Sequence, residues 1–412
     1  MKNEKSPKST ENGRRRFIKS GLGGAALAAL PMSVSAKVGA DGKERKNRDT
    51  QPKKQTALRE RKNVKDLRPQ EKAAFTQGIL ELKRTKSPFF KNNMLSYYDS
   101  IVRIHQLAVI QSRHQGWGVG HKCPSLLPFH RKLVLLLEDA LQSVTKNTNI
   151  TVPYWDWTDE SSTDIVFNED FMGEHTGLPE NNYAVMTGPF KKGDYELNLI
   201  TVPDGDNDYL NFCPFTYLTR GPRTGNTGLM DFMKDLPLPT QEEVDMAMAC
   251  ENYDVTPYNP SVDRTKSFRN YLGGWGKKGG APTLHNVVHT WTGGAWNAET
   301  YRYSPADSAW VKASRPFVGT MQALQTSAND PVFFLHHSNV DRIWAEWQAK
   351  DGNGGLDGYP EYKDGDTAYK KEWRADGEIP VFAAHKDIPE MNKDQITNGS
   401  MLDISELGYE YV

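Results

Sequence analysis

The chain has 412 residues, of which 37% are hydrophobic and 10% aromatic, enough to bury the core of one large domain or two ordinary ones. Its formal net charge of −1 conceals an uneven distribution, because residues 1–56 hold 14 of the 51 Lys and Arg but only 5 of the 52 Asp and Glu. The remainder carries a charge of about −10. This acidity argues against nucleic acid as a partner, since phosphate binding needs a positive surface.

The N-terminal segment has the pattern of an export signal. Residues 14–19 read RRRFIK, a twin-arginine pattern, and a weakly apolar stretch over residues 21–30 leads to a small-residue cleavage site ending at Ala36. The stretch is shorter than the roughly 20 residues of a membrane span. We therefore expect a bacterial signal peptide at residues 1–36, no membrane span, and delivery by the twin-arginine export machinery to the periplasm or the exterior. The alternative is a disordered basic arm.

Residues 37–56 are polar and charged, which predicts a disordered linker, and residues 57–412 are expected to form a single folded domain that becomes ordered near Arg61. Apolar periodicity predicts helices over residues 69–82, 97–110, 127–144, 282–290 and 331–349. Residues 160–280 are rich in Gly, Pro, Asn and Asp and predict long loops with short elements, whereas residues 379–382 and 407–412 predict short strands. The expected fold is mainly α, with four helices around a core, long loops and a few short strands.

Two sets of three histidines stand out from this pattern. His105 lies within one predicted helix, His121 in a loop flanked by Gly and Pro, and His130 at the start of the next helix. The second set begins with His285 and His289, which are four residues apart and therefore project from one face of a helix.

The third member of the second set is His336 or His337. These neighbours point about 100° apart on a helix, so spacing leaves the choice between them open. Imidazole suits copper, zinc and iron, and two all-histidine sites indicate a symmetric metal pair. This favours two copper ions sharing one dioxygen over a hydrolytic metal pair, which usually has bridging carboxylates, or a thiolate-rich structural zinc site.

Three residues near the His336–His337 pair have predicted local roles. Pro331 suits the first helical position, with Asp330 as the cap. Asp341 lies one turn after His337, where it is placed either to orient that histidine or to pair with a neighbouring arginine.

The other histidines and the cysteines are predicted to lie outside this chemistry. His114, His175 and His385 fall in polar loops and are expected at the surface. The three cysteines, Cys123, Cys213 and Cys250, form no disulfide framework, and their number is compatible with either a Cys213–Cys250 bridge or three buried thiols.

Five segments together resemble the tyrosinases, the type-3 copper phenol oxidases that include catechol oxidases and are related to molluscan haemocyanins. They are YDSIVRIH at residues 98–105, GHKCPSLLPFHR at 120–131, PYWDW at 153–157, LHNVVHTW at 284–291 and DPVFFLHHSNVDRIW at 330–344. The resemblance runs from about Arg61 to the C-terminus and implies a four-helix bundle that holds a dinuclear copper site.

The resemblance also implies the ligands. In the family the second histidine of the His-His pair, followed four residues later by Asp, binds copper, so His337 is the ligand and His336 its neighbour. His105, His121 and His130 correspond to the first copper, and His285, His289 and His337 to the second. The domain at 57–412 is then the copper-binding catalytic domain.

The implied reaction uses dioxygen as co-substrate to oxidise small o-diphenols to o-quinones, which polymerise into melanin-like pigment, and in some members to hydroxylate monophenols. The substrate ring lies near the residue corresponding to His289. Members that hydroxylate monophenols often pair an Asn, here Asn286, with a Glu to hold a water that deprotonates the phenol. Gly273 stands where that Glu is expected. We therefore expect monophenol hydroxylation to be weaker than diphenol oxidation.

Further departures concern access and cross-linking. Leu324 stands at the gate position above the site, often a smaller Val, and is expected to narrow access. Cys123 follows His121, whereas the fungal thioether cysteine precedes its histidine, so a free thiol is expected.

The end of the chain carries a further expectation. The tyrosines at 409 and 411 resemble the motif that closes the catalytic domain, and Arg61 is expected to pack on them as a cation–π contact. The chain stops just after this motif without a lid domain, which predicts export in an active form.

Two alternatives to a diphenol oxidase remain open. One is a catechol-only or o-aminophenol oxidase, and the other, from another class, is a haemocyanin-like dioxygen carrier. Carriers shield the copper pair with an added domain or subunit contacts, so the enzyme is preferred. The sequence makes no prediction of the oligomeric state.

Overall fold

The computed structural model describes residues 58–412 except 91–93, 202–211, 223–235, 276–282, 297–300, 303–309, 312–316, 351–357, 362–364 and 385–395. These residues belong to one compact unit, Thr56–Val412. The predicted signal peptide and linker, with their boundaries at 36 and 56, lie outside the described residues. Among the described helices, none combines the length and apolar character needed to cross a membrane.

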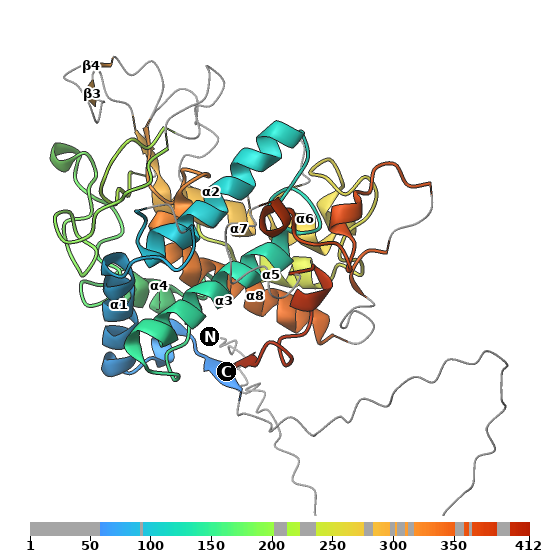
Figure 1. Ribbon diagram of the computed structural model, residues 1–412, viewed down its shortest axis with the longest axis horizontal. Helices are drawn as coiled ribbons and strands as arrows, with labels where there is room; N and C mark the ends of the chain where they lie inside the picture. The colour runs from blue at the N-terminus through green and yellow to red at the C-terminus, as the bar shows by residue number, and fades with distance from the viewer. Residues whose placement is uncertain are drawn as a thin grey trace, which may run out of the picture. The chain divides into compact units, whose positions relative to one another are not determined.

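The described part of the chain is mainly helical, as predicted (Figure 1). Its α-helices are α1 (Pro69–Arg84), α2 (Tyr97–Gln115), α3 (Leu126–Thr145), α4 (Glu160–Val166), α5 (Gln241–Met248), α6 (Phe268–Leu272), α7 (Leu284–Gly293), α8 (Val332–Gln348) and α9 (Pro380–Ala384). The five helices expected from periodicity correspond to α1, α2, α3, α7 and α8, and the described parts of the region 160–280 contain the short helices α4, α5 and α6.

Local sequence signals account for where the long helices begin and end. Pro69 occupies the first position of α1, and the Glu71 carboxylate accepts a hydrogen bond from the Arg68 N–H at 2.8 Å. The Ser96 hydroxyl accepts from the Asp99 N–H at the start of α2, and Gly116 ends that helix in the left-handed conformation with φ 70°. Capping therefore places the helix that carries His105.

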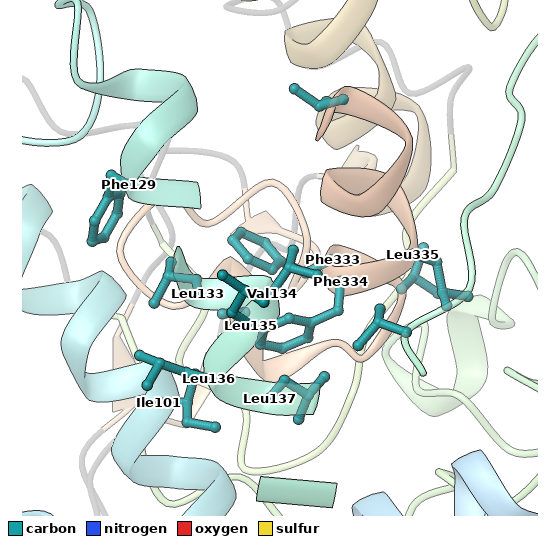
Figure 2. Packing of buried hydrophobic residues seen from close by; sticks show 14 of the residues in the cluster. Ile101, Phe129, Leu133, Val134, Leu135, Leu136, Leu137, Phe333, Phe334 and Leu335 are labelled. Carbon is teal, nitrogen blue, oxygen red and sulfur yellow. The ribbon is translucent and has the colours of Figure 1, made fainter. Parts of the chain in front are cut away.

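α3 is the central helix of the core. It packs against α1, α2 and α8, and α7 packs against α8. Figure 2 shows leucine and valine side chains of α3, from Leu133 to Leu137, beside Ile101 of α2 and the aromatic start of α8 at Phe333 and Phe334. This apolar contact fixes the relative positions of helices that also carry histidines.

The strands are short and pair two by two. β1 (Arg59–Arg61) runs parallel to β6 (Tyr409–Tyr411), with Arg59 opposite Tyr409 and Arg61 opposite Tyr411. β2 (Ala295–Trp296) pairs antiparallel with β5 (Phe317–Val318), and β3 (Tyr301–Arg302) with β4 (Trp310–Val311). The β1–β6 pair joins the first and last described segments, and its second strand agrees with the prediction for residues 407–412.

Two local predictions need correction. Residues 379–382 were expected to be a strand, but Pro380 begins the short helix α9. A four-residue apolar run does not distinguish strand from helix, and Pro suits the first turn of a helix. α8 begins at Val332 rather than Pro331, although the Asp330 carboxylate still accepts a hydrogen bond from the Val332 N–H at 3.1 Å.

Candidate metal centre

The first group of histidines comes from two helices and the loop between them. His105 lies in α2, His121 in the loop and His130 in the first turns of α3. One ring nitrogen from each lies within 4.8 Å of the others, and all three side chains are buried. The sequence-predicted first triplet is therefore brought together by the α2–α3 hairpin.

The second group comes from α7 and α8. His285 and His289 lie one turn apart on α7, and His336 and His337 are adjacent on α8. Ring nitrogens of all four lie within 4.8 Å of one another. Three of these rings are buried and that of His289 is half-buried, so His289 is the member nearest to solvent.

The two groups adjoin each other. The rings of His130 and His337 stack with centroids 4.1 Å apart and planes 6° apart, and the His130 and His285 centroids are 6.1 Å apart. Phe333, one turn before His337 on α8, packs against rings of both groups, with centroids 5.0 Å from His105 and 5.9 Å from His289. The arrangement is one continuous cluster of imidazoles around an aromatic side chain.

Backbone carbonyls fix the orientation of three of these rings. The Nδ1 atoms of His130 and His289 each lie 2.8 Å from a carbonyl oxygen, that of Leu126 and Met321 respectively, and the His105 Nδ1 lies 3.4 Å from the Gln325 carbonyl oxygen. Because a carbonyl only accepts, Nδ1 must carry the proton in each ring. The Nε2 lone pair is then free to bind a metal.

The bare ring nitrogens fit a metal pair. Within the described part of the chain, His130 Nε2, His285 Nε2 and both nitrogens of His336 and of His337 are buried without a hydrogen-bond partner. Leaving such atoms unpaired is costly unless something binds them. His105 Nε2 and His121 Nε2 lie 3.2 Å apart. This is close to the roughly 3.3 Å that separates two nitrogens bound to the same tetrahedral ion at about 2.0–2.1 Å.

Burial keeps these imidazoles neutral, as metal ligands must be. It lowers the pKa of His105 to about 3 and that of His289 to about 4. The pKa values of His121, His130 and His337 also fall well below the ordinary value, first through burial and then through neighbouring imidazoles. A second proton on any of these rings would put charge into a dry, crowded cluster.

The other predicted site residues surround the second group. Asn286 follows His285 on α7, and its Oδ1 lies 3.1 Å from His285 Nδ1. Gly273 is the residue that caps the C-terminal end of α6. A Cβ at Gly273 would lie 2.9 Å from the Arg269 carbonyl oxygen and 3.0 Å from Leu126 Cδ2.

Leu324 is half-buried on the segment between the two carbonyls that hold His289 and His105. This segment follows β5, and the structure adds no contact that assigns Leu324 a role in access.

Asp341 does not orient His337. Its carboxylate pairs with Arg131, lies 3.2 Å from Arg61 Nη1, and accepts from the hydroxyls of Tyr409 and Tyr411 at 2.7 and 2.6 Å. Although burial raises the pKa of Asp341, Arg131 and Arg61 outweigh this and hold the pKa below its usual range. The alternative prediction, an ion pair with a neighbouring arginine, is therefore confirmed. The predicted cation–π contact is also present, with Arg61 Cζ 3.6 Å from the Tyr409 ring centroid.

The remaining histidines and the cysteines have structural surroundings. His114 is exposed, as expected, but lies on the last turn of α2 rather than in a loop, and His175 is half-buried with its ring centroid 4.0 Å from that of Trp291. His385 lies outside the described residues. Cys123, Cys213 and Cys250 are buried free thiols.

Some contributors to the site were not predicted. The carbonyl groups of Met321, Gln325 and Leu126 carry no signal in the sequence, because every residue has one. Phe333 does carry one, since it precedes His337 by four residues and so lies on the same face of α8.

Fold and site together define a helical protein with a paired, all-histidine metal site. The family model described as "Common central domain of tyrosinase" matches residues 95–350. A tyrosinase of Streptomyces antibioticus is 34% identical over 70% of this chain and 83% of its own length, and grixazone synthase of Streptomyces griseus subsp. griseus is 32% identical over 70% of this chain and 84% of its own length.

The chain belongs to the tyrosinase family. Its enzyme class is that of a type-3 copper polyphenol oxidase, as predicted. The fold agrees: a mutant polyphenol oxidase of Thermothelomyces thermophila aligns with a TM-score of 0.52 and 19% identity over 86% of this chain and 89% of that one.

Proposed function

We propose that the protein oxidises o-diphenols to o-quinones with dioxygen, at two coppers held by His105, His121 and His130 and by His285, His289 and His337. The observation that carries the proposal is the pair of adjoining histidine groups, each with ring nitrogens within 4.8 Å of one another. The tyrosinase relatives support copper as the metal. When bound, the copper pair would supply redox chemistry in two-electron steps, so that two diphenols give four electrons and four protons and one dioxygen is reduced to two waters.

The side chains around the pair have separate tasks in this reaction. The Met321 and Leu126 carbonyls hold His289 and His130 with Nε2 bare, so these ligands need no reorganisation to bind metal. Phe333 and the core beneath it exclude water from the buried side. His289 is the half-buried member, so a phenol ring approaching from solvent meets it first and can stack on it.

Gly273 and Asn286 favour diphenols over monophenols. A monophenol must lose its proton to a base, and Gly273 has no side chain that could hold a water for this step. The Asn286 oxygen is directed to His285, at 3.1 Å. The resemblance assigns the water that deprotonates a monophenol to these two positions. Gly273 has no side chain to hold it, and the Asn286 oxygen is already hydrogen-bonded to His285.

The test compares DOPA with tyrosine as substrates of the copper-loaded protein, with quinone formation followed for each. We expect turnover of DOPA and much slower turnover of tyrosine. Asn286→Ala removes the side-chain partner of His285, so it should weaken copper binding and slow the turnover of both substrates. Equal rates on the two substrates would contradict the role given to Gly273, and no turnover of either substrate, or of o-aminophenol, would contradict the enzyme assignment.

We also propose that residues 1–36 are an export signal read by the twin-arginine machinery, so that the enzyme acts outside the cytoplasm. The RRRFIK run at residues 14–19 and the small residues before Lys37 support this. N-terminal sequencing of the protein from its bacterial host should start near Lys37, and a start at Met1 would contradict the proposal.

A further inference from the structure

One segment of backbone holds a histidine from each group. Between β5 and the short 3-10 helix Ser327–Asn329, the Met321 carbonyl oxygen lies 2.8 Å from His289 Nδ1 and the Gln325 carbonyl oxygen 3.4 Å from His105 Nδ1. These two histidines lie on different helices, α7 and α2. The direction in which each presents Nε2 therefore depends on where residues 321–325 lie.

Two glycines bring this segment against the end of α7. A Cβ on Gly319 would overlap the carbonyl oxygen of Gly293, the last residue of α7, and would lie 2.8 Å from the Thr219 carbonyl oxygen. A Cβ on Gly293 would lie 2.5 Å from Gln322 Cβ. Neither position has room for even the smallest side chain, because in each case the neighbour includes backbone that cannot rotate away.

Hydrogen bonds hold the segment at both ends. The Thr320 N–H donates to the Thr219 carbonyl at 2.8 Å, and the Thr219 N–H donates to Thr320 Oγ1 at 2.9 Å. At the other end the Tyr98 hydroxyl of α2 donates to the Ala328 carbonyl at 2.9 Å. The segment is thus fastened near α7 at its start and to α2 at its end, the two helices whose histidines it holds.

We propose that residues 319–325 form a clamp shared by the two copper sites, in which the close contact of Gly293 with Gly319 sets the directions of His289 and His105. Gly293 and Gly319 are then positioning residues that touch neither metal nor substrate. Leu324 lies on the clamp, so a shift of the clamp also moves the predicted gate. The consequence for copper rests on the proposed function, but the clamp itself is a property of the metal-free chain.

The experiment measures hydrogen exchange of the histidine Nδ1–H protons in metal-free, ¹⁵N-histidine-labelled protein by NMR. In Gly319→Ala we expect faster exchange at both His105 and His289. His130 is the internal control, because its Nδ1–H donates to Leu126 in its own helix, and its exchange should not change. Copper binding in this variant should weaken by about 10- to 100-fold, the usual effect of losing the partner of a metal ligand.

Two more variants complete the test. Thr320→Val removes the oxygen that accepts from the Thr219 N–H without adding bulk. It should speed the exchange of the His105 and His289 Nδ1–H protons, but less than Gly319→Ala. This variant tests the clamp if Gly319→Ala does not fold. Gly377→Ala places a Cβ 2.6 Å from the Lys371 carbonyl oxygen, and should lower thermal stability without changing exchange at His105 or His289.

Unchanged exchange at His105 and His289 in the folded variants would overturn the clamp, as would an equal change at His130, which signals general loosening. Wild-type protein that binds fewer than two coppers would instead contradict the proposed function, while the exchange measurement would still report on the clamp.

Discussion

His336 and His337 are neighbours on α8, and both rings are buried among the histidines of the second group. Both rings lie near His285, at 5.0 and 4.9 Å. Their other contacts differ. The His336 ring also lies 5.2 Å from Trp157, whereas the His337 ring stacks on His130 of the first group at 4.1 Å. His337 therefore lies between the two groups and His336 at their edge, which is consistent with His337 as the ligand.

This difference predicts an asymmetric effect of removing each ring. His337→Ala should lower the copper content towards one per chain and abolish diphenol oxidation, because one site loses a ligand. His336→Ala, the matched control at a neighbouring buried position, should retain two coppers. Metal analysis of both purified variants decides, and loss of copper only in His336→Ala would reverse the assignment.

For individual residues, the sequence predicts which side chains belong to the site but not how each side chain is oriented. His285 and His289 follow from helical spacing, and His105, His121 and His130 from two helices and a loop. Spacing left the choice between His336 and His337 open, and only the resemblance to the family implied His337. Spacing left the partner of Asp341 open as well. That carboxylate can reach several groups, and only the packing of α3 and β6 against α8 shows that arginines and tyrosines surround it.

Among the elements, the β1–β6 pair joins the two ends of the described chain through a buried network. Arg61 on β1 donates from Nε to Glu138 of α3 at 2.9 Å, and its Nη1 lies 3.2 Å from Asp341 of α8. All three side chains are buried. Without Arg61, the buried Glu138 would keep only the partly exposed Arg59 and Asp341 only Arg131, so each carboxylate would lose a buried counter-charge.

Arg61→Ala should therefore destabilise the fold by about 3–5 kcal/mol, as expected for breaking a buried ion pair. Arg59 on the same strand is the control: it also contacts Glu138, at 3.0 Å, but its side chain is 21% exposed, so Arg59→Ala should cost at most about 1 kcal/mol. Urea unfolding compares the two. An Arg61→Ala protein as stable as the wild type would contradict the stabilising role of this network.

Element types were predictable where the apolar pattern was long. α1, α2, α3 and α8 each extend over four turns or more, and their periodicity together with caps such as Ser96 locates them within a few residues. Residues 379–382 are too few to show a period, and their apolar side chains fit a strand or a buried helix equally well. In the structure most of these residues belong to the helix α9, which packs against α2.

For the whole molecule, the packing of the core determines how far apart the two histidine groups lie. α3 packs against both α2 and α8, so the apolar contact in Figure 2 that holds these helices together also sets the separation of the two histidine groups. The groups share the His130–His337 stack, and the segment at 319–325 holds a ring from each. A protein built in this way should use the two metals as one unit.

Titration of the metal-free wild-type protein with copper, with bound copper and diphenol oxidation followed together, tests whether the two metals act as one unit. We expect two coppers per chain, with oxidation rising in proportion to doubly loaded protein. Saturation at a single copper, or full activity when only one is bound, would show that the paired histidine groups do not work together.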